Sequence, residues 1–207
     1  MPNLIIIRGN AASGKSSLAR ALQQQLGENT LRLSQDELRR EMLLAHDGFD
    51  TPTISLLKTL LHYGFNNCDY IILEGILKAD WYQPIWHYIT ENPQIKTFAY
   101  YYDLTFEETV KHHSQRAKSK DFGKASLKKW WNDKDYMKTI PEQLFNAELS
   151  IEQALSHILK DMSLGQKSKL KYKKRTRQYS EYQKTSFVRF LGFIYHLEKL
   201  MAGNLKN

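Results

Sequence analysis

The stretch IIIRGNAASGKSSLA, residues 5–19, contains an apolar part, a part with small residues and the start of a segment with helical spacing of leucine. It begins inside an apolar, β-branched run, Leu4 to Ile7, which predicts a short buried strand that ends at Arg8. Small residues follow, and then a segment in which leucine recurs at helical spacing, at Leu18, Leu22 and Leu26. The stretch therefore predicts a strand, a tight loop and a helix in direct succession.

The loop matches the pattern G-x-x-x-x-G-K-[ST] at every defined position, from Gly9 to Ser16. In this pattern the glycines let backbone N–H groups surround a phosphate, and the helix that follows adds the positive end of its dipole. Lys15 would reach the β- and γ-phosphates, and the Ser16 hydroxyl would bind Mg²⁺. A chance Gly/Ser turn is the alternative, and the flanking strand and helix disfavour it. The predicted phosphate-binding residues are Gly9, Asn10, Ala11, Ala12, Ser13, Gly14, Lys15, Ser16 and Ser17.

Length and composition allow one moderate α/β domain, because 207 residues with 42% hydrophobic content are enough for a full core. Cys68 is the single cysteine, so an intrachain disulfide is excluded, and a reducing, cytoplasmic location is expected. The sequence shows neither a secretory signal nor an apolar run long enough to span a membrane. We expect no transmembrane segment.

Charge divides the chain into two parts. Residues 1–164 carry 19 Lys and Arg against 20 Asp and Glu, whereas residues 165–207 carry 11 against 2. The basic excess therefore belongs to the tail. We expect residues 1–164 to form the phosphate-binding domain, and 165–207 to be a basic tail ending in an amphipathic helix.

Strand and helix patterns alternate through the first part. Strands are expected at 30–34, 69–75 and 95–103, and a weaker fifth one within 142–150. Helices are expected at 35–45, 53–66, 81–90, 105–116 and 126–134, and after Ser150, which has Gln153 at capping-box spacing. This alternation predicts a parallel sheet with helices on both faces and ligands at the carboxyl ends of the strands.

Two further carboxylates fall at such strand ends. Asp36, in LSQDELRRE, is placed to accept the proton of an attacking hydroxyl, and Arg39 follows on the same helix face to hold an anionic acceptor group. Alternatively, Asp36 only stabilises a helix N-terminus and Arg39 is a solvated charge. Glu74 ends the strand YIILEG, where it could bind hydrated Mg²⁺ or orient the acceptor, or be an ordinary strand-end charge.

This order of motifs resembles the P-loop kinases of small molecules, within the nucleoside-triphosphate hydrolase superfamily. Residues 1–163 are similar to the polynucleotide-kinase-like and zeta-toxin-like kinases, and to bacterial proteins labelled uridine kinase. The resemblance implies a five-stranded parallel sheet of order 2-3-1-4-5, with ATP and Mg²⁺ bound at Lys15 and Ser16. It also implies that Asp36 is the catalytic base and that Arg39 contacts the acceptor.

The resemblance further implies a small lid around residues 112–135, with Arg116 as its catalytic arginine. The segment RAKSK supplies Arg116, Lys118 and Lys120, and a solvated basic loop is the alternative interpretation. Trp130 and Trp131 could stack on a base or pack the lid onto the core.

Two functions of different classes remain open. The first is an ATP-dependent kinase, a phosphotransferase acting on a hydroxyl of a nucleoside, sugar or similar small molecule, with a polynucleotide 5′-hydroxyl as a variant acceptor. The second is a non-catalytic, nucleotide-dependent protein whose basic tail binds nucleic acid. The tail could also bind an anionic membrane, or its apolar stripe could pack on the domain or on a second copy of the chain.

Overall fold

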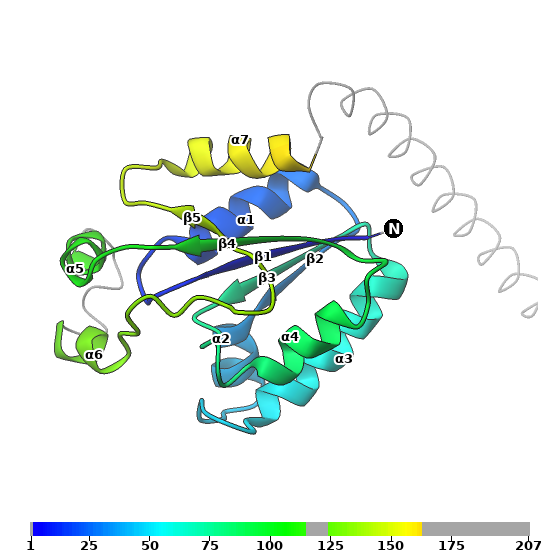
Figure 1. Ribbon diagram of the computed structural model, residues 1–207, viewed down its shortest axis with the longest axis horizontal. Helices are drawn as coiled ribbons and strands as arrows, with labels where there is room; N and C mark the ends of the chain where they lie inside the picture. The colour runs from blue at the N-terminus through cyan, green and yellow to red at the C-terminus, as the bar shows by residue number, and fades with distance from the viewer. Residues whose placement is uncertain (1, 115–123, 163–207) are drawn as a thin grey trace, which may run out of the picture. The chain divides into compact units, whose positions relative to one another are not determined.

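The computed structural model describes residues 2–114 and 124–162. They form five strands with helices between them (Figure 1). The strands are β1 (Asn3–Gly9), β2 (Thr30–Ser34), β3 (Tyr70–Gly75), β4 (Lys96–Tyr102) and β5 (Gln143–Phe145). The helices are α1 (Lys15–Leu26), α2 (Gln35–Glu37), the π-helix η1 (Leu38–Met42), α3 (Pro52–Asn67), α4 (Gln83–Thr90), α5 (Phe106–Ser114), α6 (Lys124–Lys129) and α7 (Ile151–Asp161).

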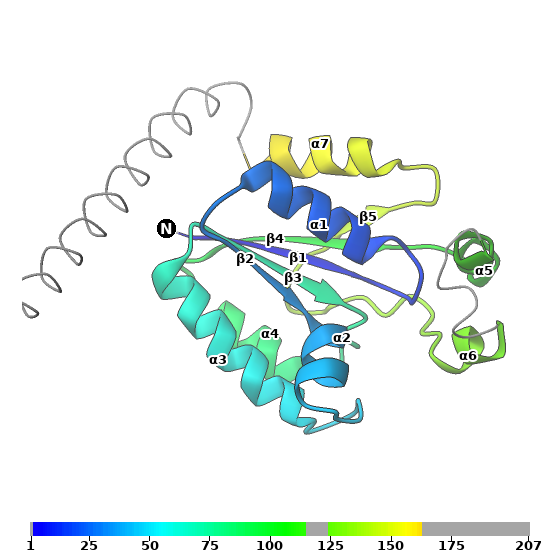
Figure 2. The same ribbon diagram turned by 180° about the vertical axis from the view of Figure 1, so that it is seen from behind.

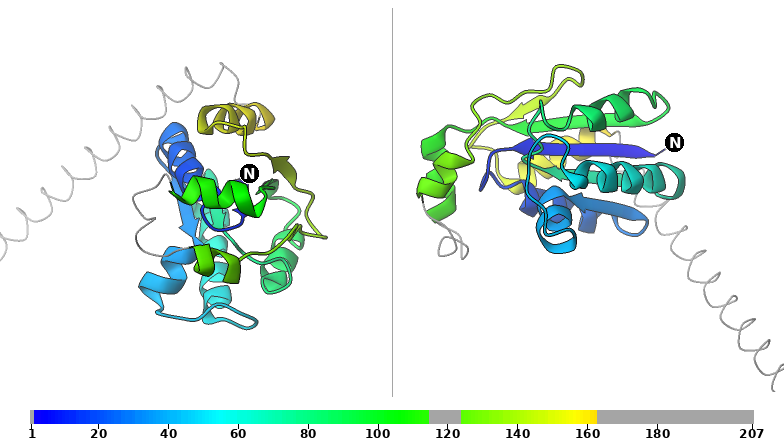
Figure 3. Two further views of the ribbon diagram at one scale, coloured as in Figure 1. Left: turned by 90° about the vertical axis from the view of Figure 1, so that its left-hand side faces the viewer. Right: turned by 90° about the horizontal axis from the view of Figure 1, so that it is seen from below.

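The sheet is parallel throughout, with the order β2-β3-β1-β4-β5. Both the fold class and the strand order predicted from the sequence are confirmed. Because every strand runs the same way, all five carboxyl ends lie at one edge of the sheet, where ligands bind in such folds. Figure 3, left, looks onto this edge, with α5 and α6 in front.

β1 is the central strand, paired with β3 on one side and with β4 on the other. Its run Leu4–Ile7 is fully buried, as expected for a strand covered on both faces. Helices α1 and α7 cover one face of the sheet, and α3 and α4 cover the other (Figures 1 and 2). The loop that follows β1 therefore projects from the rigid centre of the molecule.

Two helices end well before the residue that the sequence predicts. The helix expected at 35–45 is divided into α2 and η1 and ends at Met42; Leu44 has a φ of 50°, which cannot continue a right-handed helix. The helix expected at 126–134 is α6, which ends at Lys129, because the N–H of Asn132 donates to a side chain on the loop after β1 instead of to its own helix.

Several predictions fall on residues that the structure does not describe. Arg116, Lys118 and Lys120 lie between α5 and α6, outside the described ranges, and so does the basic tail from residue 165 onward. Within residues 2–114 and 124–162, no helix has both the length and the apolar character needed to cross a membrane.

Candidate nucleotide and acceptor site

The loop from Gly9 to Gly14 adopts a conformation that its sequence makes possible. Gly9, Ala12 and Gly14 have φ angles of 140°, 62° and 108°. A Cβ on Gly9 would lie 2.9 Å from Cβ of Tyr102, so only glycine fits where the loop crosses the end of β4. The loop therefore follows a path that larger residues at these positions would block.

The N-terminus of α1 is left open toward this loop. Gly14 is its N-cap residue, no side chain caps the helix, and its first turn holds no acidic residue. Unpaired N–H groups and the helix dipole make such an end suited to an anion. Lys15 is buried, and its Nζ donates to the carbonyl of Asn10 at 2.6 Å and to Ser13 Oγ at 3.3 Å. A phosphate would offer this ammonium group a charged acceptor, which is stronger than these two neutral ones.

Glu74, on β3, contacts the N-terminal end of α1. Ser16 Oγ donates to Glu74 Oε2 at 3.1 Å, and Glu74 is only 2% exposed. Its second oxygen, Oε1, is buried and accepts no hydrogen bond. A buried carboxylate oxygen that accepts no hydrogen bond is costly unless a ligand completes it. Carboxylate and hydroxyl oxygens are ligands that Mg²⁺ prefers, so Ser16 and Glu74 fit a magnesium ion or its bound water.

Arg32 on β2 is a member of this site that the sequence reasoning missed. Its Nη1 lies 4.0 Å from Glu74 Oε1 and is itself buried without a hydrogen bond, while Nη2 binds Glu37 at 2.8 Å. The hydrogen bond from Arg32 lowers the pKa of Glu37. A charged residue inside the short strand TLRLS was the available signal, because strand interiors rarely carry an unpaired charge.

Asp36 and Arg39 lie together at the carboxyl end of β2, as the sequence predicts for residues three apart on a helix. Asp36 Oδ1 accepts from Arg39 Nη2 at 2.9 Å and from Arg40 Nε at 3.0 Å. Its Oδ2 receives no hydrogen bond from any residue within the described ranges, and the side chain is 58% exposed. Arg39 also donates to the carbonyl of Ala45 at 3.2 Å. Asp36 is thus held by two arginines through one oxygen, while the other oxygen lies on a side chain that is more than half exposed.

Three buried or half-buried polar side chains lie behind this pair and were not predicted. Gln35 Nε2 donates to Asp47 Oδ2 at 3.0 Å and to the Tyr82 hydroxyl at 2.9 Å. The Tyr82 hydroxyl donates to Asp47 Oδ1 at 2.7 Å. Burial, and then the Asp47 carboxylate, raise the pKa of Tyr82, so this hydroxyl remains a donor. Nothing in the sequence signals these contacts, which join α2, the loop before α3 and the start of α4.

A pocket of about 390 Å³ opens on the other side of the loop. Ser13, Gly14, Tyr102 and His112 line one part of it, and residues 146–151 line the rest. It is large enough for a nucleoside and borders the helix end that suits a phosphate. The sequence analysis assigned no ligand-binding role to residues 146–151, since they carry no nucleotide-binding motif.

The two tryptophans of the expected lid have different neighbours. Trp131 packs edge-on against Phe106 of α5, with ring centroids 5.4 Å apart. The Arg40 guanidinium lies over Trp130, 5.6 Å from the ring centroid. The structure therefore links Trp131 to packing between α5 and the segment after α6, and Trp130 to the arginines beside Asp36.

The described residues combine a parallel sheet of order 2-3-1-4-5, a phosphate-binding type of loop after the central strand, and carboxylates at the ends of β2 and β3. The comparison with known families agrees, because residues 4–92 match the family model described as an AAA domain. No curated protein matches the sequence.

Solved structures with this fold include several kinases. The chain resembles an APS kinase from Mycobacterium tuberculosis, solved with AMPPNP and APS, with a TM-score of 0.57 and 17% identity over 78% of this chain and 98% of that one. A gluconokinase from Sinorhizobium meliloti has a TM-score of 0.55 and 12% identity, over 80% of this chain and 98% of that one. A tunicamycin resistance protein from Deinococcus radiodurans also has a TM-score of 0.55, with 14% identity over 78% and 96%. At these identities the likeness establishes the shared fold.

Proposed function

We propose that the protein is an ATP-dependent kinase that transfers the γ-phosphate to a hydroxyl group of a small molecule. One observation carries the proposal: the ion pair of Asp36 with Arg39 and the contact of Ser16 with Glu74 lie at the same edge of the sheet, at the ends of adjacent strands. A protein that only binds nucleotide needs no acceptor-side carboxylate there. The likeness to solved kinases of small molecules supports the same reaction class.

The donor half of the reaction rests on the phosphate loop. The backbone N–H groups of Gly9 to Ser16 and the Lys15 ammonium would bind the β- and γ-phosphates, with the Asn10 carbonyl keeping Lys15 in place. Ser16 and Glu74 would hold Mg²⁺, whose positive charge neutralises the transferring phosphoryl group. The pocket beside Tyr102 and residues 146–151 is our candidate for the nucleoside.

The acceptor half rests on Asp36. Its open Oδ2 would take the proton from the acceptor hydroxyl as that oxygen forms a bond to the γ-phosphorus. The bond from the γ-phosphorus to the bridging oxygen breaks in the same displacement, and ADP leaves with that electron pair. Arg39 would orient the acceptor or Asp36 itself, and Arg116 would neutralise charge on the transferring group, as the family resemblance implies.

Transfer of labelled γ-phosphate tests this function. The assay offers ATP with a panel of nucleosides, sugars, aminoglycoside-type antibiotics and 5′-hydroxyl oligonucleotides. Asp36→Asn is expected to keep ATP affinity and to lose transfer by about 10²-fold or more, as for loss of a general base. Lys15→Ala should lose both, and Asp50→Asn, on an exposed loop, is the matched control. Nucleotide binding without label in any acceptor would overturn the proposal.

The charge of the tail favours one alternative acceptor class. Residues 165–207 carry 11 basic and 2 acidic residues, which suits a nucleic-acid phosphate backbone. If a 5′-hydroxyl polynucleotide is the acceptor, deleting 165–207 should reduce transfer strongly at low salt and weakly at high salt. A small-molecule kinase should be indifferent to that deletion. RNA or DNA binding that depends on nucleotide, without transfer, would instead support the non-catalytic function.

A further inference from the structure

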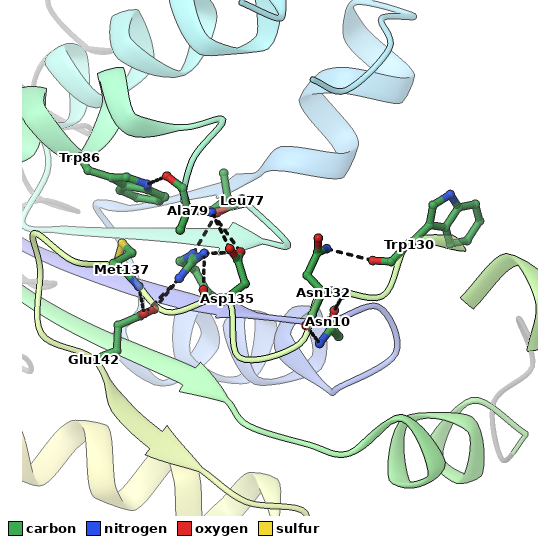
Figure 4. A network of polar contacts seen from close by, with 10 residues as sticks. Asn10, Leu77, Ala79, Trp86, Trp130, Asn132, Asp135, Met137 and Glu142 are labelled. Carbon is green, nitrogen blue, oxygen red and sulfur yellow. Dashed lines mark hydrogen bonds and ion pairs between the residues drawn. The ribbon is translucent and has the colours of Figure 1, made fainter. Parts of the chain in front are cut away.

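The side chain of Asn10 binds the main chain of a residue 122 positions away. Its Nδ2 donates to the carbonyl of Asn132 at 2.7 Å, and its Oδ1 accepts from the N–H of Asn132 at 2.9 Å (Figure 4). Asn10 is 3% exposed, so both bonds form away from water. A carboxamide carries a donor and an acceptor side by side, which match one peptide C=O and one N–H at once, whereas an ionised carboxylate of the same size has no donor.

The segment that Asn10 contacts is itself fixed to the core. Arg8, two residues before Asn10, is fully buried and donates to Asp135 Oδ2 at 2.9 Å and to Glu142 Oε1 at 2.9 Å. It also donates to the carbonyl of Leu77 at 3.0 Å. The rings of Trp86 and Tyr101 flank its guanidinium, each with a centroid 5.5 Å away.

Arg8 and the residues that contact it form what we call the Arg8 cluster. Its two carboxylates, Asp135 and Glu142, each accept a further hydrogen bond from a main-chain N–H. Asp135 Oδ2 accepts from the N–H of Ala79 at 2.9 Å, and Glu142 Oε2 accepts from the N–H of Met137 at 2.7 Å (Figure 4). A buried ion pair with its remaining lone pairs satisfied is rigid, because breaking any one contact leaves a charge without a partner. The segment from Asn132 to Glu142 is therefore an anchored support, against which Asn10 is placed.

The main chain of Asn10 connects this support to the nucleotide site. The carbonyl that accepts from Lys15 Nζ belongs to the residue whose side chain is tied to Asn132. Turning or shifting the Asn10 peptide would displace both the Lys15 ammonium and the N–H groups that follow in the loop. Catalytic and binding groups work best when neighbouring contacts hold them in place before the ligand arrives.

We propose that Asn10 is a positioning residue. Its two side-chain hydrogen bonds connect the phosphate loop to the segment 132–142, and they hold the loop and Lys15 in the geometry that binds triphosphate. This inference rests on the proposed function only in assuming that the loop binds nucleotide. It assigns a role to the Asn132 main chain and to the residues around Arg8, none of which belongs to the loop from Gly9 to Gly14.

The test measures binding of AMPPNP with Mg²⁺ to the full chain by calorimetry, alongside thermal unfolding. Asn10→Ala is expected to weaken binding by about tenfold or more, which corresponds to about 1.4 kcal/mol and is the scale of one or two lost hydrogen bonds. Asn10→Asp should weaken it further, because a carboxylate faces the Asn132 carbonyl without a donor. The melting temperature of Asn10→Ala should change by only a few degrees.

Asn132→Ala is the discriminating variant. Asn10 binds residue 132 through its main chain. Removal of the Asn132 side chain, which donates to the Trp130 carbonyl at 3.0 Å, keeps both bonds to Asn10 and should keep AMPPNP affinity within about twofold. Asn92→Ala, which removes a side-chain bond to the Tyr88 carbonyl far from the loop, is a second control.

Three results would overturn the inference: wild-type affinity in Asn10→Ala, equal losses in Asn10→Ala and Asn132→Ala, or a loss of affinity that follows the fall in melting temperature. If the wild-type chain binds no nucleotide, the proposed function fails together with this inference. If Asn10→Ala binds AMPPNP normally while Asp36→Asn loses transfer, the inference fails and the proposed function stands.

Discussion

Single residues in this site take their chemistry from what surrounds them. Glu74 is a strand-end carboxylate by sequence, but the fold makes it a buried one with one oxygen on Ser16 and the other without a hydrogen bond. Arg32 Nη1 lies 4.0 Å from that second oxygen. Such an oxygen is suited to a metal ion or to one of its water ligands.

Glu74→Gln should therefore raise the Mg²⁺ requirement of the protein. The amide has the same size and can still accept from Ser16, but it lacks the negative charge that attracts the ion. We expect the Mg²⁺ concentration for half-maximal AMPPNP binding to rise by about tenfold, the scale seen when groups that support a metal site are removed.

Glu37→Gln is the matched control for this experiment. Glu37 also binds Arg32, but it makes no contact with Ser16. The control should leave the Mg²⁺ dependence unchanged, and equal responses of the two variants would show that Glu74 acts only through Arg32.

At the scale of elements, the N-termini of α7 and α1 differ: the first is capped by side chains and the second is not. α7 is closed by a capping box, in which Gln153 N–H donates to Ser150 Oγ at 3.2 Å and Ser150 N–H donates to Gln153 Oε1 at 2.9 Å. α1 has no side-chain cap, although serine stands directly before Gly14. The closed end stabilises its helix, and the open end leaves donors for a ligand.

Ser150→Ala should destabilise the fold by about 1 kcal/mol, because the first turn of α7 loses its side-chain acceptor. Urea unfolding of the full chain would measure this change. Ser114→Ala, at the C-terminal end of α5, removes a hydroxyl that donates to the Lys111 carbonyl and should have a smaller effect. A Ser150→Ala chain as stable as the wild type would mean that α7 contributes little to the folding transition.

At the scale of the whole domain, Arg8 and its partners join the central strand to the loop after β3, to α4 and to the segment before β5. Tyr101 is one of these partners: its ring flanks Arg8 and packs edge-on against Tyr136, with centroids 5.2 Å apart. Burial raises the pKa of Tyr101 to about 12, above the ordinary value of 10. Burial also raises the pKa of Tyr136 to about 12.

These pKa values predict a loss of stability in alkali. A group with a raised folded-state pKa stabilises the fold fully below its unfolded value and loses that contribution as the pH rises through the folded value. The free energy of unfolding should therefore fall between about pH 10 and 12, and a pKa difference of one corresponds to about 1.4 kcal/mol for each tyrosine.

Urea midpoints at pH 8, 10 and 11 would measure this effect. Tyr101→Phe removes one titrating hydroxyl and should show a shallower fall than the wild type over the same range. A stability that is flat up to pH 11 would contradict the burial of these hydroxyl groups.

Much of the fold was predictable because its signals are local. The strand before Gly9, the helix after it and the capping box at Ser150 depend on residues within a few positions of one another. The pairing of Asp36 with Arg39 also follows from helical spacing. The catalytic and binding roles of these residues stay predictions, as does that of Arg116, which lies outside the described ranges.

The sequence by itself determined a parallel α/β domain with a phosphate loop after its central strand, since hydrophobic periodicity and a dense short motif are both local patterns. Only the tertiary structure decided which groups surround that loop: Arg32 beside Glu74, and Asn132 and Asp135 beside the residues that begin the loop. The last two contacts join residues more than 120 positions apart in the sequence. The polar groups of these residues are buried by folding, and a buried polar group needs a hydrogen-bond partner. This requirement arises only in the folded chain, so the sequence alone does not indicate which residue the partner is.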